Sequence, residues 1–149
     1  MIKKVILLVL CTTYLFSNGF ALNSNINSFV LNDQFDKPHT VNADTKTILV
    51  SFEKSTGEHV NEFLSTKESN FLEKNNAVFI ADISGMPSII TSLFALPKMK
   101  KYNYNVLLIY DEEDKRFLRQ EERITVYTLE EGVIKSISYI QKEDIPTTF

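Results

Sequence analysis

The sequence predicts an α/β fold with a central mixed sheet and a hairpin at each end of the chain. Two apolar, β-branched segments, 47–52 and 77–83, are separated by a predicted helix, which is typical of parallel strands joined by a crossover. A third apolar segment, 105–110, follows them. Residues 124–140 then alternate apolar and polar side chains around a turn at Gly132, which predicts an antiparallel hairpin with one solvated face.

Residues 1–21 have the three-part pattern of a secretory signal peptide. Lys3 and Lys4 precede an apolar run, and the small residues Gly19 and Ala21 suit cleavage after Ala21. The apolar run is shorter than the ~20 residues that a membrane-spanning helix needs, so we expect cleavage rather than a retained anchor. The sequence therefore predicts an exported protein, periplasmic or alternatively secreted, with no transmembrane segment after cleavage.

Charge and cysteine content exclude several functions. The chain has 16 basic and 19 acidic residues, and the signal peptide takes two of the lysines, so nucleic acid is not an expected partner. The one cysteine, Cys11, lies within the signal peptide. The mature chain should therefore have no thiol, which excludes disulfides, thiolate catalysis and cysteine-bound metals. Its three glycines form no dinucleotide-binding fingerprint, so we expect no cofactor.

We expect the mature chain to form a single domain, residues 29–149, after a flexible lead-in at 22–28 that is rich in Asn and Ser. Residues 29–31 and 40–41 flank a segment, 32–38, with the Asn, Asp and Pro residues of a turn. These residues predict a leading hairpin.

A first helix is expected to begin near Thr56, with Ser55 and Glu58 forming a capping box. The polar residues 65–68 interrupt the apolar pattern and divide the helix into two. Apolar residues at roughly helical spacing should face the core: Val60, Phe63, Leu64, Phe71 and Leu72.

A second helix is expected after Ser84, with Pro87 in its first turn. Because Pro97 cannot continue an undisturbed helix, residues 98–101 should form a kinked extension or a separate turn. Residues 115–122 are expected as a short helix or an edge segment. The predicted core face of the second helix comprises Ile89, Ile90, Leu93, Phe94 and Leu96.

This order of elements resembles the three-layer thioredoxin-like fold of peroxiredoxins and envelope thiol-disulfide oxidoreductases. The resemblance rests on Phe29-x-Leu31 with Asp33, on the segment 38–41, and on the strand 106–111, which ends in Asp. It is closest to small exported YtfJ-like proteins, and it covers nearly the whole mature chain.

The resemblance also places the two cysteines of the family's Cys-x-x-Cys motif at Gly57 and Val60, neither of which can form a thiolate. The family's cis-proline would fall near Arg123, and no proline lies between Pro97 and Pro146. Both halves of the redox site are absent. The resemblance therefore implies a chain that is not a thiol-disulfide oxidoreductase, and we expect a binding protein rather than an enzyme.

The strand-to-helix turn is the first candidate site. The positive end of a helix dipole can bind a carboxylate or phosphate. Glu53, Glu58 and His59 are also expected to meet near this turn. With His39 approaching from the leading hairpin, they would form a weak metal site or an acid/base pair. The alternative is an ordinary helix cap without a metal. The candidate binding residues are Lys54, Ser55, Thr56, Glu58 and His59.

The second candidate is an interaction surface within residues 94–104, where lysines and tyrosines follow an apolar helix broken by Pro97. Lysines attract acidic protein partners or anionic lipid, and aromatic residues anchor interfaces. The alternative is structural, with lysines favoured at a helix C-terminus and tyrosines in the core. The residues of this candidate surface are Lys98, Lys100, Lys101, Tyr102 and Tyr104.

Three functions remain open from the sequence. The first is a redox-inactive binding or accessory module in the cell envelope, with an envelope protein as partner. The second is a cysteine-independent enzyme, or a ligand- or metal-binding protein, that uses the turn from Glu53 to His59. The third is a structural subunit of an envelope assembly.

Overall fold

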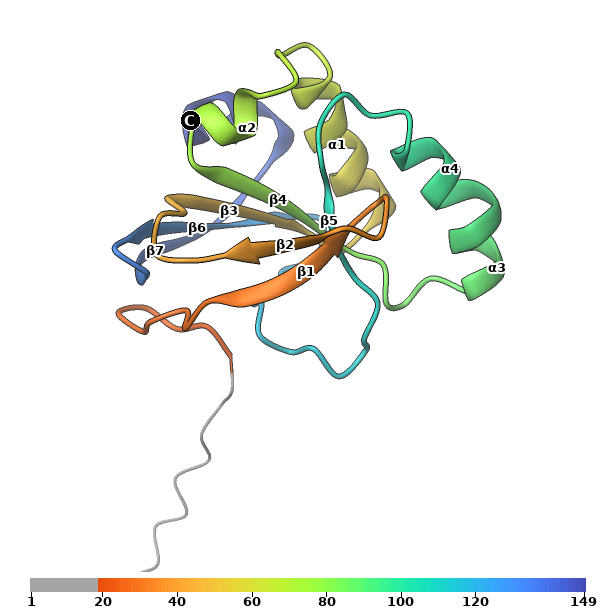
Figure 1. Cartoon of the computed structure of the whole chain (residues 1–149). Helices are drawn as coiled ribbons and strands as arrows, with labels where there is room; N and C mark the ends of the chain where they lie inside the picture. Colours follow the sequence, from red (N-terminus) through yellow and green to blue (C-terminus); the bar gives the residue numbers. More distant parts are fainter. Residues whose placement is uncertain (1–18) are drawn as a thin grey trace, which may run out of the picture.

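The computed structural model describes residues 19–149, so most of the predicted signal peptide lies outside the described residues. Seven strands form one mixed sheet, and most helices lie on one of its faces (Figure 1). In chain order the elements are β1 (Phe29–Asp33), β2 (Pro38–Val41), β3 (Thr47–Ser51), α1 (Lys54–Leu64), α2 (Phe71–Lys74), β4 (Ala77–Asp82), α3 (Ser88–Ile90), the π-helical turn η1 (Thr91–Ala95), α4 (Leu96–Met99), β5 (Leu107–Ile109), β6 (Ile124–Glu130), β7 (Val133–Ile140) and the 3-10 helix η2 (Lys142–Thr148).

The sheet has the strand order β2-β1-β5-β4-β3-β6-β7. Strands β3, β4 and β5 are parallel, whereas β1, β6 and β7 join it through antiparallel pairs. Leu49 in β3, for example, lies opposite Phe79 of β4 and Val126 of β6. The predicted α/β fold, its central parallel strands and both predicted hairpins are therefore confirmed.

The central strands are mostly apolar, as expected where both faces of the sheet are covered. All five residues of β3 are buried. Leu49 belongs to a core cluster shared with Val60 and Leu64 of α1, whereas Ile48 and Val50 point into a second cluster. The first cluster also receives side chains from α2, α4 and η2, so these helices form one outer layer.

The opposite face is covered by loops and the start of the described chain. Phe20 and Phe117 pack there against Tyr127 of β6. The backbone N–H of Leu118 donates to the Tyr127 hydroxyl oxygen (2.7 Å), and burial raises the pKa of that phenol to about 12. Residues 115–122, expected as a short helix or an edge segment, are a loop.

Helix α1 begins earlier than expected and lacks the predicted capping box. Its N-cap is Glu53, and no side chain caps the first turn. Ser55 is already the second helical residue, too far along to serve as N-cap, and the carboxylate of Glu58 binds Lys98 instead. The capping-box prediction was therefore wrong.

The predicted core face of the second helix was also wrong. Ile89, Leu93 and Phe94 are 64%, 62% and 65% exposed, and Ile90 is 40% exposed. Only Leu96 of the predicted set packs against the core, because the α3–η1 segment stands away from the sheet (Figure 1).

Pro97 had the predicted effect on this helix. It lacks the N–H that would bond to residue 93, and its ring would clash with that carbonyl in a regular helix. The chain widens there into η1, where the N–H of Leu96 donates to the carbonyl of Thr91, five residues earlier. Within residues 19–149, no helix has both the length and the apolar character needed to cross a membrane.

Candidate functional site

The strongest candidate site is a groove of about 620 Å³ at the carboxyl ends of β3 and β4. Ligand sites of open α/β sheets characteristically lie beyond the carboxyl ends of parallel strands. One wall is the first turn of α1 and the other is the α3–α4 segment, on the right in Figure 1. Its floor includes Ser51, the last residue of β3, and Asp82, the last residue of β4.

Much of the groove is apolar and adaptable. Phe52 and Met86 line it from the loops after β3 and β4, and Met99 lines it from α4. Methionine side chains can repack around different apolar partners. Ile90 and Phe94 line the open side of the groove, where both side chains are exposed.

A charged rim joins the two walls. Lys98 of α4 binds Glu58 of α1, with 3.0 Å between Nζ and Oε1, and Lys54 lies 3.9 Å from the same oxygen. The hydrogen bond from Lys98 lowers the pKa of Glu58, and the same bond raises the pKa of Lys98. Both groups are therefore charged at neutral pH, and together they hold α4 beside the N-terminus of α1.

A second ion pair closes the end of the groove. Arg119, from the loop before β6, binds Glu53 at 3.2 Å and lies over the ring of Phe52, 5.7 Å from its centroid. The backbone N–H of Glu122 donates to the other oxygen of Glu53 (3.0 Å). Arg119 is 66 residues from Glu53 and belongs to no motif, so nothing in the sequence alone indicates that it lies at this site.

The two positions of the absent redox cysteines have different environments. Gly57 lines the groove, and its N–H donates to the Glu53 carbonyl (3.0 Å). A methyl group at Gly57 would lie 3.4 Å from the hydroxyl oxygen of Ser51, an ordinary contact distance. Val60 is completely buried in the core cluster under α1.

Only part of the first candidate set faces this groove. Lys54 and Glu58 line it, whereas Ser55 and His59 do not. Thr56 is buried, and its hydroxyl donates to the Glu53 carbonyl (3.0 Å).

The prediction that His39 approaches the strand-to-helix turn was wrong. His39 lies on β2, which is an edge strand of the sheet. Strands β1, β5 and β4 lie between β2 and β3, so His39 is three strands removed from this turn. His39 instead binds Asp33, with 2.7 Å between Nε2 and Oδ2.

The second candidate set divides between surface and core. Lys100 and Lys101 are exposed beside the groove, and within residues 19–149 neither forms an ion pair. Tyr104 does not lie on the surface: it is buried, and its hydroxyl donates to Asn61 Oδ1 (2.8 Å). Tyr102 is half-buried and stacks on Tyr104. The usable part of the predicted surface is its lysines.

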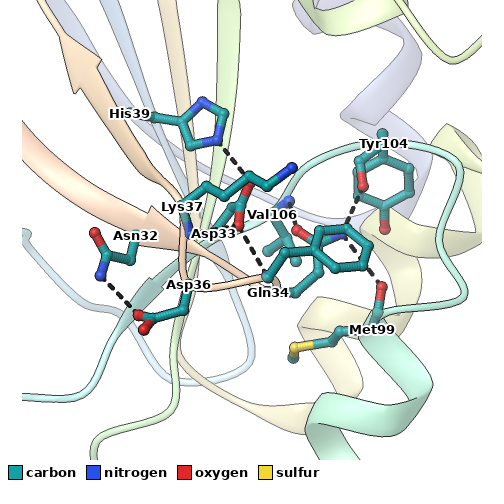
Figure 2. Close-up of polar contacts among 10 residues, drawn as sticks. Asn32, Asp33, Gln34, Asp36, Lys37, His39, Met99, Tyr104 and Val106 are labelled. Atoms are coloured by element: carbon teal, nitrogen blue, oxygen red, sulfur yellow. Dashed lines mark hydrogen bonds and ion pairs between the residues drawn. The ribbon is translucent and has the colours of Figure 1, made fainter.

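Figure 2 shows a polar cluster in the turn between β1 and β2. Buried Asp33 accepts hydrogen bonds from the N–H groups of Phe35 and Lys37 as well as from His39. Burial alone would raise the pKa of Asp33, but the bond from His39 and the two backbone bonds outweigh burial and lower it. The cluster fixes the hairpin turn.

The comparisons with known proteins identify the fold. No family model and no curated protein matches the sequence. The thioredoxin domain of a thiol-disulfide oxidoreductase from Bacteroides vulgatus matches with a TM-score of 0.56 at 16% identity, over 87% of this chain and 96% of that one. The chain has a thioredoxin-like fold.

Two further structures agree with this thioredoxin-like assignment. A thiol:disulfide interchange protein from a Bacteroides species matches with a TM-score of 0.51 at 15% identity, over 86% of this chain and 88% of that one. The peroxidoxin BcpB from Mycobacterium tuberculosis matches with a TM-score of 0.52 at 8% identity, over 86% and 92%. Likeness at this level of identity establishes the fold alone, because one fold supports many functions.

Proposed function

We propose that this chain is an exported, redox-inactive thioredoxin-like protein that acts as a binding module in the cell envelope. The groove beyond β3 and β4 would take an extended apolar segment of a protein partner. The observation that carries the proposal is the apolar face of Ile89, Ile90, Leu93 and Phe94, which is exposed along the mouth of that groove.

The exposed face supports a protein partner because four large apolar side chains lie together in water. Scattered exposed apolar residues are ordinary, but a contiguous patch marks an interaction site. Ile90 and Phe94 line the groove, while Ile89 and Leu93 extend the apolar surface beyond it. A peptide in the groove would cover this face and remove it from water.

The charges beside the groove favour acidic residues next to the apolar segment. Lys98 is already paired with Glu58, but Lys100 and Lys101 are exposed at the end of α4. Exposed lysines beside a binding surface raise the association rate of partners with the opposite charge. The expected ligand is therefore an apolar segment followed or preceded by Asp or Glu.

Export and redox inactivity are supported by the sequence. The pattern in residues 1–21 is that of a signal peptide, and the one cysteine lies within it. The resemblance assigns the redox cysteines to Gly57 and Val60. Gly57 lines the groove and has no side chain that can react, and Val60 is buried in the core. A periplasmic location follows, with secretion as the alternative.

The enzyme hypothesis has less support. A pair of acids acting as acid and base needs both carboxylates near one reacting atom. Glu53 binds Arg119 and Glu58 binds Lys98, so each is engaged by a different cation. A structural subunit would use the same apolar face, but in a permanent rather than a reversible complex.

Selection of random displayed heptapeptides on the purified protein tests the proposal. The selected peptides should combine apolar residues with Asp or Glu, and a Phe94→Asp variant should bind them at least about tenfold more weakly. Val30→Asp is a matched control, because Val30 is also an exposed apolar residue but lies on β1. Peptides that bind the Phe94→Asp variant as well as the parent would contradict the proposal.

A further inference from the structure

The first described residues complete the core on the face opposite the helices. Phe20 is only 8% exposed. Its ring makes edge contacts with Phe117 (5.1 Å between centroids) and Tyr127 (5.9 Å), and it lies 5.7 Å from the ring of Phe29. The backbone N–H of Phe20 donates to the carbonyl of Arg116 (2.7 Å). Phe20 therefore anchors the loop before β6 to the sheet.

A turn at residues 21–24 sets the direction of the chain into this cluster. The hydroxyl of Ser24 donates to the carbonyl of Ala21 (2.7 Å) and accepts from the Ala21 N–H (3.1 Å). The carbonyl of Ser24 accepts from the N–H of Ile134 in β7 (2.9 Å), and the N–H of Ile26 donates to the carbonyl of Gly132 in the β6–β7 turn (2.9 Å). The segment expected to be a flexible lead-in is thus fastened on both sides of the turn.

Two positions in this region satisfy the small-residue rule for signal cleavage. A cut after Ala21 has Ala21 and Gly19 as the small residues one and three places before the bond. A cut after Gly19 has Gly19 and Ser17 in the same places. The sequence pattern does not separate the two.

The folded protein distinguishes them. A cut after Ala21 would remove Phe20 and leave a cavity among Phe29, Phe117 and Tyr127, and cavities of aromatic size are among the most destabilising changes in a core. It would also remove the carbonyl to which Ser24 is bonded. A cut after Gly19 keeps both. The new α-amino group of Phe20 would still donate to the Arg116 carbonyl, because an ammonium carries three N–H donors.

We propose that the mature protein begins at Phe20, with the signal peptide cleaved between Gly19 and Phe20. This inference rests on the export that forms part of the proposed function. Hydrolysis of that one peptide bond adds a water molecule and leaves a carboxylate on Gly19 and an amino group on Phe20.

The test is the intact mass of the full chain, produced with a C-terminal affinity tag in a bacterium with an outer membrane and purified from the envelope fraction. The expected product begins at Phe20. A product that begins at Leu22, or an uncleaved precursor, would overturn the proposal. Neither result touches the groove, whose peptide binding is measured separately, so the two proposals fail independently.

Matched variants make the assignment specific. Ala21→Glu destroys the small-residue pattern of the Ala21 site alone, and Ala21 is exposed, so cleavage before Phe20 should continue unchanged. Ser17→Leu destroys the pattern of the Gly19 site alone and should reduce the Phe20 product in favour of precursor or of the Leu22 product. The reverse pattern of effects would overturn the proposal.

The role of Phe20 in the fold has its own measurement. In the purified mature protein, Phe20→Ala should lower the Tm by roughly 10 °C. Leu22→Ala is the control, because Leu22 is 56% exposed and its truncation should leave the Tm nearly unchanged. Equal Tm values for Phe20→Ala and the parent would remove the structural reason for retaining Phe20.

Discussion

Two residues of α1, Gly57 and Val60, stand at the positions to which the resemblance assigns the redox cysteines. Gly57 has no side chain, and Val60 packs in the core as an ordinary apolar residue. Neither position is strained: Gly57 lies within a regular helix and has room for a methyl group. The glycine opens the floor of the groove at a cost to helix stability.

Gly57→Ala should therefore increase the free energy of unfolding by about 0.5–1 kcal/mol, because alanine loses less backbone entropy in a helix. Urea denaturation measures the change. Gly132→Ala is the control with the opposite sign, because Gly132 has a φ of +80° in the β6–β7 turn. A destabilised Gly57→Ala variant would show that the groove floor is more crowded than the structure indicates.

The Asp33–His39 pair predicts a contribution to acid sensitivity. The pKa of Asp33 is lowered from 3.8 in the folded protein, so the unfolded chain binds the proton more tightly. The stabilisation is complete above about pH 5 and is lost as the pH falls through the folded pKa, below the unfolded value.

Urea midpoints measured from about pH 6 to about pH 3 should thus fall more steeply for the parent than for Asp33→Asn. Asp36→Asn is a suitable control, because Asp36 is an exposed carboxylate in the same turn. Parallel curves for the parent and Asp33→Asn would mean that Asp33 titrates normally.

At the scale of elements, the buried side-chain amide of Gln34 joins the β1–β2 turn to two other parts of the fold. The side-chain N–H₂ of Gln34 donates to the carbonyls of Tyr104 (2.8 Å) and Met99 (3.3 Å), and its oxygen accepts from the N–H of Val106 (3.0 Å), as Figure 2 shows. Gln34 therefore links the β1–β2 hairpin to the end of α4 and the start of β5. The Asn, Asp and Pro residues predict the turn, but no local pattern predicts this link, because the bonded residues are about 70 positions away.

Gln34→Leu should lower the free energy of unfolding by about 2–3 kcal/mol, because it leaves the Val106 N–H and the Tyr104 carbonyl buried without partners. Asn32→Ala removes an exposed hydrogen bond to Asp36 in the same hairpin and should cost less than about 0.5 kcal/mol. Urea denaturation compares them. A Gln34→Leu variant as stable as Asn32→Ala would contradict the assigned role of Gln34.

In the α3–η1 segment, helical periodicity predicts which side chains share a surface but not whether that surface is buried. Helical spacing correctly grouped Ile89, Leu93 and Phe94 on one surface, but it does not say what covers that surface. The same pattern is produced by a helix that faces a core and by one that faces a partner. Only the position of the segment relative to the sheet separates the two.

At the scale of the whole molecule, the apolar pattern predicts the central parallel strands and both hairpins, but not the order of the strands in the sheet. Continuous apolar runs predict strands covered on both faces, and alternation in 133–140 predicts a strand with one solvated face. The groove could not be predicted in the same way. It needs Phe52, Phe94 and Arg119, which come from three separate elements and share no motif.

The chain has a thioredoxin-like fold, and we propose that the groove of this fold binds protein segments. Phe94 can be replaced by the photo-reactive residue p-benzoylphenylalanine in the full chain, which is then irradiated in the envelope. Val30, 55% exposed on β1, receives the same replacement as the control. We expect one discrete crosslinked protein from position 94 that is absent from position 30. No product from position 94, or the same products from both positions, would contradict it.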